Sequence, residues 1–275
     1  MNYLLKSQKI GFLGSGNMSY TIIKGLLDGQ LIHPDKIYAS NRSPGKLIKL
    51  QTDLGVNTVP TNEQLVESSD IVVLAVKPQD LLSAIEPLRQ CFQPHQIVIS
   101  LAAGIRMDVL KKYLPISRII RMMPNTPALI GKGVIGYVCG NDVYLDDLIQ
   151  SLFSSLGKIV KVEDEDQLES LMIACSSGTG FVFELMSYWQ DWLEEYGFTP
   201  EESKTMTTET FLGAAMLADK MSNFSFEELQ NKVASKKGVT AAGLQSMREL
   251  EIDRALRISF EKAGIRSQEL SNTLK

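Results

Sequence analysis

The stretch that decides the fold is Lys9–Ser19, KIGFLGSGNMS. Its first six residues, Lys9–Gly14, form a short apolar run that predicts a buried strand, and Asn17–Leu27 has the spacing of a helix. Two glycines join them: the first allows a tight turn, and the second lets the backbone approach a pyrophosphate. Because backbone N–H groups at a helix start bind phosphate, the segment predicts a dinucleotide site. Its residues are Gly14, Ser15, Gly16, Asn17 and Met18.

The alternation of short apolar runs and helical patterns continues for about 160 residues of the chain. Such alternation is typical of βαβ units, so the sequence predicts a doubly wound parallel sheet with helices on both faces. The further predicted strands are Lys36–Ser40, Val56–Val59, Asp70–Val76, Gln96–Ser100, Arg118–Met122, Gly133–Val138 and Lys158–Val162.

The pattern changes at the acidic stretch Glu163–Asp166, after which no strand is expected. Thr199 and Ser225 each begin a capping box, which is typical of a helix start. We therefore predict an α/β fold with a Rossmann-type domain over residues 1–165 and an all-helical domain over residues 166–275. Aromatic side chains on the long helices of the second part predict a dimer or higher oligomer. They are Phe181, Phe183, Trp189 and Trp192.

Composition excludes several functions. The net charge of −4, with 28 basic residues against 32 acidic ones, argues against nucleic acid. No apolar run of the roughly 20 residues that span a bilayer is apparent, so no membrane is expected. The start, MNYLLKSQKIGF, does not have the shape of a signal peptide, and three cysteines without CxxC spacing favour a reducing cytoplasm. With only two histidines, no metal site is predicted.

The end of the second predicted strand indicates which cofactor is bound. A protein that binds the ribose 2′-hydroxyl of NAD would have Asp or Glu there, whereas this chain has Ser40, Asn41 and Arg42. A carboxylate would repel a 2′-phosphate, and an arginine with a hydroxyl would bind it. NADP(H) is therefore the predicted cofactor, with NAD(H) left open as a second one. The alternative is that Arg42 is an ordinary solvated loop arginine.

Further cofactor contacts are expected where other strands end, because ligands of such sheets bind beyond the carboxyl ends of the strands. Pro78 could equally open the next helix as part of a simple connector, and Asn62 could merely follow Thr61 in a helix cap. The residues predicted to contact the cofactor there are Asn62, Ala75, Val76, Lys77, Pro78 and Ala103.

With these motifs placed, the chain resembles the pyrroline-5-carboxylate reductase family. The matching segments are IGFLGSGNM (10–18), SNR (40–42), AVKPQ (75–79), SLAAGI (100–105), RMMPNTPA (121–128), VASKKGVTAAGL (233–244) and RSQEL (266–270). The resemblance covers nearly the whole chain. It implies reduction of a cyclic imino acid by NADPH or NADH in the last step of proline synthesis, and a homodimer that often forms larger rings.

The resemblance also implies a substrate site. A helix predicted from Ala241 would offer free backbone N–H groups to the substrate carboxylate, and the hydroxyl of Thr240 would lie near the imine nitrogen as the catalytic group. Thr240 could instead be only a helix cap. The substrate-binding residues so implied are Ser235, Gly238, Val239 and Thr240.

The chain departs from the family pattern twice. Ser176–Gly180 replaces Gly-Ser-Gly-Pro, and Ser235–Thr240 reads SKKGVT where the family usually reads Ser-Pro-Gly-Gly-Thr-Thr. These changes leave two alternatives open: a related imine reductase or β-hydroxyacid dehydrogenase-like enzyme, and a nucleotide-binding regulatory paralogue without turnover. The dehydrogenases use a lysine in the long helix, and Leu168–Trp192 contains none.

Overall fold

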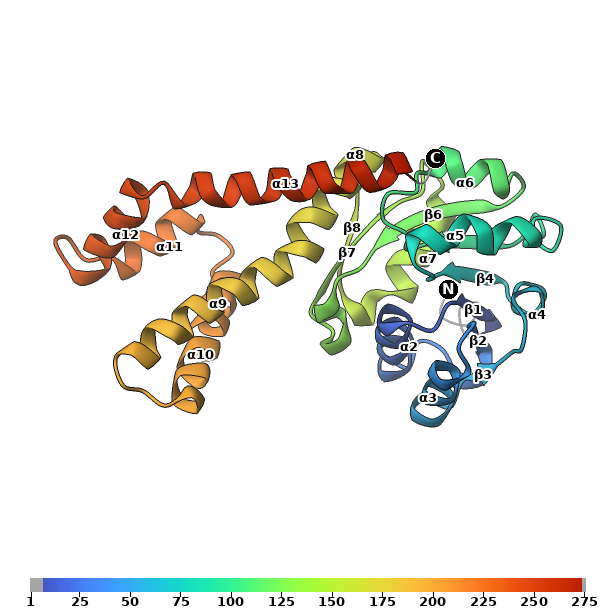
Figure 1. Cartoon of the computed structure of the whole chain (residues 1–275), viewed down its shortest axis with the longest axis horizontal. Coiled ribbons are helices and arrows are strands. Elements are labelled where there is room, and N and C mark those ends of the chain that lie inside the picture. The colour runs from blue at the N-terminus through green and yellow to red at the C-terminus, as the bar shows by residue number, and fades with distance from the viewer. Residues whose placement is uncertain (1–6, 274–275) are drawn as a thin grey trace. The chain divides into compact units, whose positions relative to one another are not determined.

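The computed structural model describes residues 7–273, and its first part is built on one eight-stranded sheet (Figure 1). The strand order is β3-β2-β1-β4-β5-β6-β7-β8. The strands are β1 (Ile10–Leu13), β2 (Ile37–Ser40), β3 (Asn57–Thr58), β4 (Ile71–Leu74), β5 (Ile97–Ser100), β6 (Arg118–Met123), β7 (Gly133–Val138) and β8 (Gly157–Lys161). All eight predicted strands are therefore present.

Helices connect most of the strands and make up the rest of the chain. Those of the sheet region are α2 (Asn17–Asp28), α3 (Pro44–Leu54), α4 (Asn62–Glu67), α5 (Pro78–Ile85), α6 (Met107–Tyr113) and α7 (Val143–Leu152). Those that follow the sheet are α8 (Glu165–Leu171), the π-helix η5 (Met172–Ser177), α9 (Gly178–Glu195), α10 (Pro200–Lys220), α11 (Phe226–Val233), α12 (Val239–Glu249) and α13 (Ile252–Thr273).

The predicted parallel sheet is confirmed at six of the seven strand pairings, and one pairing differs from the prediction. β7 runs antiparallel to β6, and β8 then runs parallel to β7. The short segment between β6 and β7 holds one 3₁₀ turn, Thr126–Ile130, and no helix long enough to carry the chain back. A parallel connection needs a crossover of a dozen or more residues, so the chain turns back instead.

The sheet is covered on both faces, as its unbroken apolar strands predict. Successive side chains of a strand point to opposite faces: Ile71 and Val73 lie in one buried cluster with α2, α3 and α7. Val72 and Leu74 lie in a second cluster with α4, α5 and α6. The carboxyl ends of β1, β2, β4 and β5 thus form a fixed edge between two cores.

Contacts divide the chain into two compact units. Unit 1 comprises Met1–Thr179 and Ala263–Lys275, and unit 2 comprises Gly180–Lys262. The border expected from composition, between residues 165 and 166, marks where helices take over. The border between the two contact-defined units lies after Thr179 instead, and unit 1 resumes at Ala263. The reason is that Leu168 of α8 is buried against the sheet and the end of α13 returns to unit 1. Residues 1–6, which carry half of the N-terminal stretch used against a signal peptide, lie outside the described residues.

Unit 2 is entirely helical. Both predicted capping boxes are present: Thr199 with Glu202 opens α10, and Ser225 with Glu228 opens α11. Its buried side chains are those of Ser203 and Thr207, while Trp189, Trp192 and many other apolar side chains are exposed. Three aromatic pairs stabilise the helices locally, among them Phe181 with Phe260, whose ring centroids lie 5.4 Å apart.

One helical stretch, Glu165–Glu195, is long and apolar enough to cross a membrane by length and composition alone. One such stretch is weak evidence for a membrane span, so the expectation of no membrane stays a prediction. Only 6% of the most apolar part of the stretch is buried within the structure. Its apolar surface coincides with the aromatic residues that predict self-association, so a second protein surface explains the same composition.

Candidate functional site

The glycine-rich loop lies between β1 and α2, where the sheet topology changes direction. Strand β1 has β2 on one side and β4 on the other, and Leu13 is in register with Ser40 and Leu74. Gly14 has φ +104°, and a Cβ there would lie 2.8 Å from the backbone of Ala75. Only glycine fits this turn, as the sequence predicts. Such a switch point is where doubly wound sheets bind their ligands.

The start of α2 fits a phosphate. Gly16 is the N-cap, no side chain caps the helix, and a Cβ on Gly16 would meet nothing within 4 Å. The hydroxyl of Ser15 is buried without a hydrogen-bond partner among the described residues. Ser19 fills the third position of the pattern and donates to the carbonyl of Gly14 at 2.7 Å, which fixes the turn. The free N–H groups and the unpaired hydroxyl suit a pyrophosphate.

The predicted 2′-phosphate site lies at the end of β2. The Ser40 hydroxyl donates to Oδ1 of Asn62 at 2.8 Å, which leaves the amide group of Asn62 as a donor. Asn41 donates to the carbonyl of Ser43, closing the loop. Arg42 is exposed and forms no ion pair or hydrogen bond within the described part of the chain. Thr61 does cap α4, so Asn62 both opens that helix and contacts β2.

The ends of β4 and β5 complete this edge. Lys77 is the N-cap of α5 and Pro78 its first residue, so the connector interpretation of Pro78 is confirmed as a local role. The N–H of Leu101 donates to the carbonyl of Leu74, which holds the loop after β5 beside β4. Ala103 lies in that loop and is partly exposed. The structure therefore gathers all the predicted cofactor residues at one edge of the sheet.

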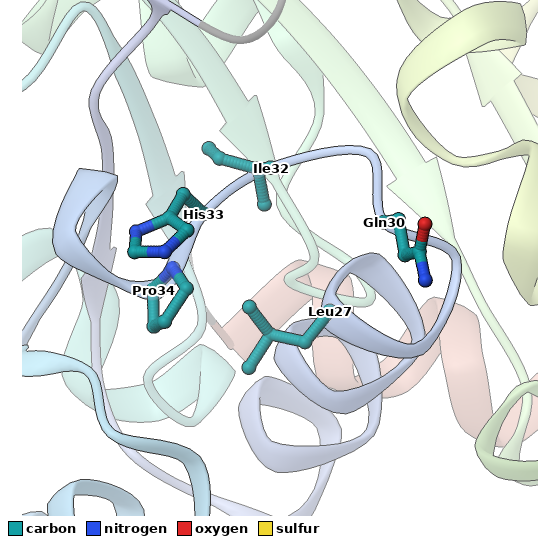
Figure 2. Close-up of a pocket in the computed structure, with 5 residues that line it drawn as sticks. All are labelled: Leu27, Gln30, Ile32, His33 and Pro34. Atoms are coloured by element: carbon teal, nitrogen blue, oxygen red, sulfur yellow. The ribbon is translucent and has the colours of Figure 1, made fainter.

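A surface hollow of about 410 Å³ lies away from this edge, at the other end of α2 (Figure 2). It is lined by Leu27, Gln30, Ile32, His33 and Pro34, none of which is a predicted site residue. Figure 2 shows Leu27 on the last turn of α2 and the other four on the loop that follows. The hollow is open, and the predicted chemistry does not use it.

The predicted substrate loop lies in unit 2 and is described by itself. Gly238 is the N-cap of α12, which begins at Val239, two residues earlier than predicted. Thr240 therefore lies inside the first turn, and the alternative that it caps the helix is wrong. No side chain caps α12, and its first turn holds no acidic residue. Val239 and Thr240 are exposed, so the helix start is open to an anion.

The loop Ser235–Gly238 forms a tight turn before α12. Lys237, where the family has glycine, adopts φ +61°, the left-handed region. A Cβ on Gly238 would lie 2.3 Å from the Ser235 hydroxyl, and the N–H of Gly238 donates to the carbonyl of Ser235. A lysine in this region carries roughly 1–3 kcal/mol of backbone strain. The turn thus forms with lysines at positions 236 and 237.

The segment RMMPNTPA (121–128) holds two polar side chains whose roles are not apparent from the sequence. Arg121 is fully buried and pairs with Glu165 at 2.6 Å and Glu169 at 2.8 Å. Asn125 donates to the carbonyl of Cys175 in the π-helix and accepts from the N–H of Val134. Each side chain thus attaches to the sheet region a helix that comes at least 40 residues later in the chain. A buried arginine in a strand was the signal that a paired carboxylate had to exist.

The remaining polar cluster of unit 1 is structural. Asp146 accepts hydrogen bonds from Lys161, Tyr137 and Cys139. Burial raises the pKa of the Cys139 thiol to about 12, and the hydrogen bond to Asp146 adds to the effect. The thiol is therefore protonated at neutral pH and is no nucleophile. Among the described residues, no group of three or more His, Cys, Asp or Glu could hold a metal ion.

Two family models match the chain. "NADP oxidoreductase coenzyme F420-dependent" matches residues 9–104, and "Pyrroline-5-carboxylate reductase dimerisation" matches residues 165–270. The first covers the strands and loops of the dinucleotide site. The second covers α8 to α12 and nearly all of α13, and it supports self-association.

Similar proteins cover the whole chain. The pyrroline-5-carboxylate reductase of Pseudomonas aeruginosa is 31% identical over 98% of this chain and 99% of its own. That of Methanosarcina acetivorans is 32% identical over 97% and 99%. A solved pyrroline-5-carboxylate reductase from Coxiella burnetii has a TM-score of 0.87 at 32% identity, covering 96% of this chain and 98% of that one. The Plasmodium falciparum enzyme, solved with NADP bound, has the same TM-score at 23% identity, with 97% and 99% covered.

The glycine turn, the open helix start and the two family models agree on an oxidoreductase that uses NAD(P)H and associates with itself. The chain belongs to the pyrroline-5-carboxylate reductase family.

Proposed function

We propose that this protein reduces 1-pyrroline-5-carboxylate to L-proline with NADPH, the last step of proline biosynthesis. The observation that carries the proposal is that each unit offers a helix start with a glycine N-cap and no side-chain cap: Gly16 before α2 in unit 1 and Gly238 before α12 in unit 2. The first suits a pyrophosphate and the second a carboxylate. The reaction brings together these two anions, the cofactor and the imino acid.

The residues of unit 1 would hold the cofactor. Ser15 and the N–H groups of Asn17 and Met18 would bind the pyrophosphate, and Arg42 the 2′-phosphate. Asn62 would donate to the ribose through the amide that Ser40 orients. When bound, NADPH supplies a hydride to the imine carbon. The loops that follow β4 and β5 would carry its reacting end, with Ala75, Val76, Lys77, Pro78 and Ala103.

The residues of unit 2 would hold the substrate. The N–H groups of Val239 and Thr240 would bind the carboxylate, and the turn formed by Ser235 and Gly238 keeps them aimed outward. The Thr240 hydroxyl has no hydrogen-bond partner among the described residues, so it is free to donate to the imine nitrogen. Most of the acceleration would come from positioning, because the reaction needs no strong nucleophile.

The organisation that fits this function is a cytoplasmic homodimer or a larger ring of dimers. The exposed aromatic side chains of unit 2 would form the interface. The overall negative charge favours a small-molecule substrate over nucleic acid, and the aromatic surface is explained without a membrane.

The test is the oxidation of NADPH with racemic pyrroline-5-carboxylate, followed by absorbance. Steady turnover that yields proline is the expected result. Binding of NADPH without turnover would overturn the proposal and favour the regulatory alternative. A matched pair of variants sharpens the test, because Thr240→Ala should reduce turnover whereas Thr208→Ala should not. Thr208 is also exposed on a helix of unit 2, where its hydroxyl bonds only to Lys204 of the same helix.

A further inference from the structure

The last turns of α13 press directly on the loop that follows β5. Gly104 in that loop has φ +77°, and a Cβ there would lie 2.9 Å from the hydroxyl of Ser271. It would also lie 3.3 Å from the amide nitrogen and 3.4 Å from the Cα of the same serine. No side chain fits between them, so the helix backbone and the loop backbone are in contact.

The end of α13 is held at two further points of unit 1. The Ser267 hydroxyl donates to Oε2 of Glu169 at 3.0 Å, and Oε1 of Glu169 accepts from the buried Arg121. Gly264 lies against Ile173 of the π-helix, where a Cβ would be 3.4 Å from the side chain. Figure 1 shows this end of α13 beside α8 and α6. The helix end is therefore fixed by charge and by packing.

Small residues make this close approach possible. Gly264, Ser267 and Ser271 recur at helical spacing and share one face of α13. The Ser271 hydroxyl donates to the carbonyl of Ser267 at 2.9 Å, within its own helix. Ser271 is small enough for the loop to pack directly against the helix. A larger side chain at position 271 would push the loop away.

The loop itself can move little in other directions. Ala102 and Ile105 are each 1% exposed and anchor its two ends in the second core. Between them, Ala103 is partly exposed at the edge of the sheet where the cofactor is proposed to lie. The contact with Ser271 therefore sets how far this loop extends from the sheet.

We infer that Ser271 is a positioning residue for the reduction. The last turn of α13 supports the Ala103 loop, and the loop sets the height of the reacting end of the cofactor. This inference rests on the proposed function. A misplacement of roughly 1 Å costs up to about 100-fold in rate when reacting atoms must be aligned. The contact should thus influence the rate of hydride transfer more than the affinity for the cofactor.

The test replaces Ser271 by leucine and uses Asn272→Leu as the matched control. Asn272 is exposed on the next position of the same helix. Ser271→Leu should lower kcat about 10-fold while the Kd for NADPH changes less than about threefold, because the proposed phosphate contacts lie elsewhere. The kinetic isotope effect with 4-deuterated NADPH should rise toward its full value. Asn272→Leu should leave all three quantities unchanged.

A second experiment covers the case in which leucine unfolds the helix end. Gly104→Ala should lower kcat, and Ser271→Gly in the same chain should restore part of the loss by removing the hydroxymethyl group that the new Cβ meets. Such non-additivity is expected only for residues in contact. Strictly additive effects, or a kcat that follows the melting temperature alone, would overturn the inference.

The two proposals fail in different ways. A wild-type protein without imine-dependent NADPH oxidation contradicts the proposed function before any variant is made. In an active wild type, equal kcat for Ser271→Leu and Asn272→Leu contradicts only the positioning role. Fluorescence of bound NADPH gives a readout independent of turnover, because a displaced loop should change the emission of the reduced ring at unchanged Kd.

Discussion

Unit 1 and unit 2 differ in how they bury apolar surface. In unit 1, three clusters of buried side chains cover both faces of a sheet, and Phe12, Ile22 and Val73 are fully buried. In unit 2, the buried side chains are the polar Ser203 and Thr207, while Phe226 is 83% exposed. Unit 1 has a core of its own. Unit 2 resembles half of a core that a second copy completes.

This difference indicates that the stability of unit 2, but not that of unit 1, should depend on protein concentration. The free energy of unfolding of a unit with its own core does not depend on protein concentration, whereas the apparent stability of an obligate interface rises with the logarithm of subunit concentration. Both tryptophans of the chain, Trp189 and Trp192, lie in unit 2. Tryptophan fluorescence therefore follows unit 2, and NADPH binding is expected to follow unit 1, where the cofactor is proposed to bind.

The largest expected effect is in the core of unit 1. Phe12→Ala removes a fully buried ring from β1 and should lower the free energy of unfolding by about 3–5 kcal/mol. Urea unfolding followed by loss of NADPH binding measures it, and the loss should be the same at low and high protein concentration. A loss below about 1 kcal/mol would show that unit 1 does not depend on this core.

The next effect should appear only in unit 2. Trp192→Glu places a charge on an aromatic position that is 56% exposed, and should weaken dimerisation by at least about 2 kcal/mol, or roughly 30-fold in Kd. Sedimentation at micromolar concentration measures it. Ile48→Glu, at a 62% exposed position of unit 1, is the control and should leave the mass unchanged. A wild-type mass of one 30.5 kDa chain would contradict the comparison itself.

The third prediction concerns the cofactor loop of unit 1. Arg42→Ala should weaken NADPH binding by about 1.5–3 kcal/mol, as expected for a charge-assisted contact to a phosphate. Binding of NADH should change little. Titration calorimetry with both cofactors measures the difference, and Lys46→Ala provides an exposed control on α3. Equal losses for NADPH and NADH would show that Arg42 supports the loop and does not read the phosphate.

The fourth prediction concerns the substrate loop of unit 2. Thr240→Ala should lower kcat/KM for the imine about 10- to 100-fold, equivalent to ~1.4–2.7 kcal/mol of transition-state stabilisation. The affinity for NADPH and the melting temperature should stay the same, because Thr240 caps no helix. A melting temperature several degrees lower with unchanged kinetics would assign Thr240 a structural role.

The smallest effect is a pH dependence confined to unit 1. Burial opposes ionisation of Asp146, but hydrogen bonds from Lys161, Cys139 and Tyr137 outweigh it and lower its pKa. A lowered pKa stabilises the fold above the unfolded-state value, about 4, and that stability is lost as the pH falls through the folded-state pKa. Asp146→Asn should therefore cost about 1 kcal/mol or less at pH 7, and the cost should vanish in acid. Urea unfolding of this variant and of the wild type across pH 3–7 measures the difference.

The sheet could be predicted from the sequence because buried strands are short apolar runs bounded by turn residues. Ile71–Leu74 and Ile97–Ser100 each lie within a predicted strand. The reversal of β7 could not be predicted from the run Gly133–Val138 alone, because direction depends on the length of the preceding connection. The π-helix at Met172–Ser177 could not be predicted either: its Cys175 carbonyl accepts a hydrogen bond from Asn125, which lies far away in the sequence.

The candidate site divides in the same way. Gly14 was identifiable because its backbone geometry requires glycine, Gly16 because of its place in the glycine pattern after a strand, and Arg42 because of the residue type it replaces. The proposed role of Ser271 could not be predicted from the sequence, because a serine on a polar helix is not distinctive. Its contact partner, Gly104, lies far away along the chain. Site residues are readable from sequence where the backbone constrains the residue type, and unreadable where two distant segments meet.

The return of α13 to unit 1 has a consequence for synthesis. Unit 2 is inserted in the chain between Thr179 and Ala263, so unit 1 gains the support of Ser267 and Ser271 only after all of unit 2 has left the ribosome. Bringing these segments together across a flexible insertion of about 80 residues costs on the order of 4 kcal/mol of chain entropy. Folding of unit 2 before α13 docks would remove much of that cost. The cofactor edge should therefore be completed last, after the helical insertion has formed.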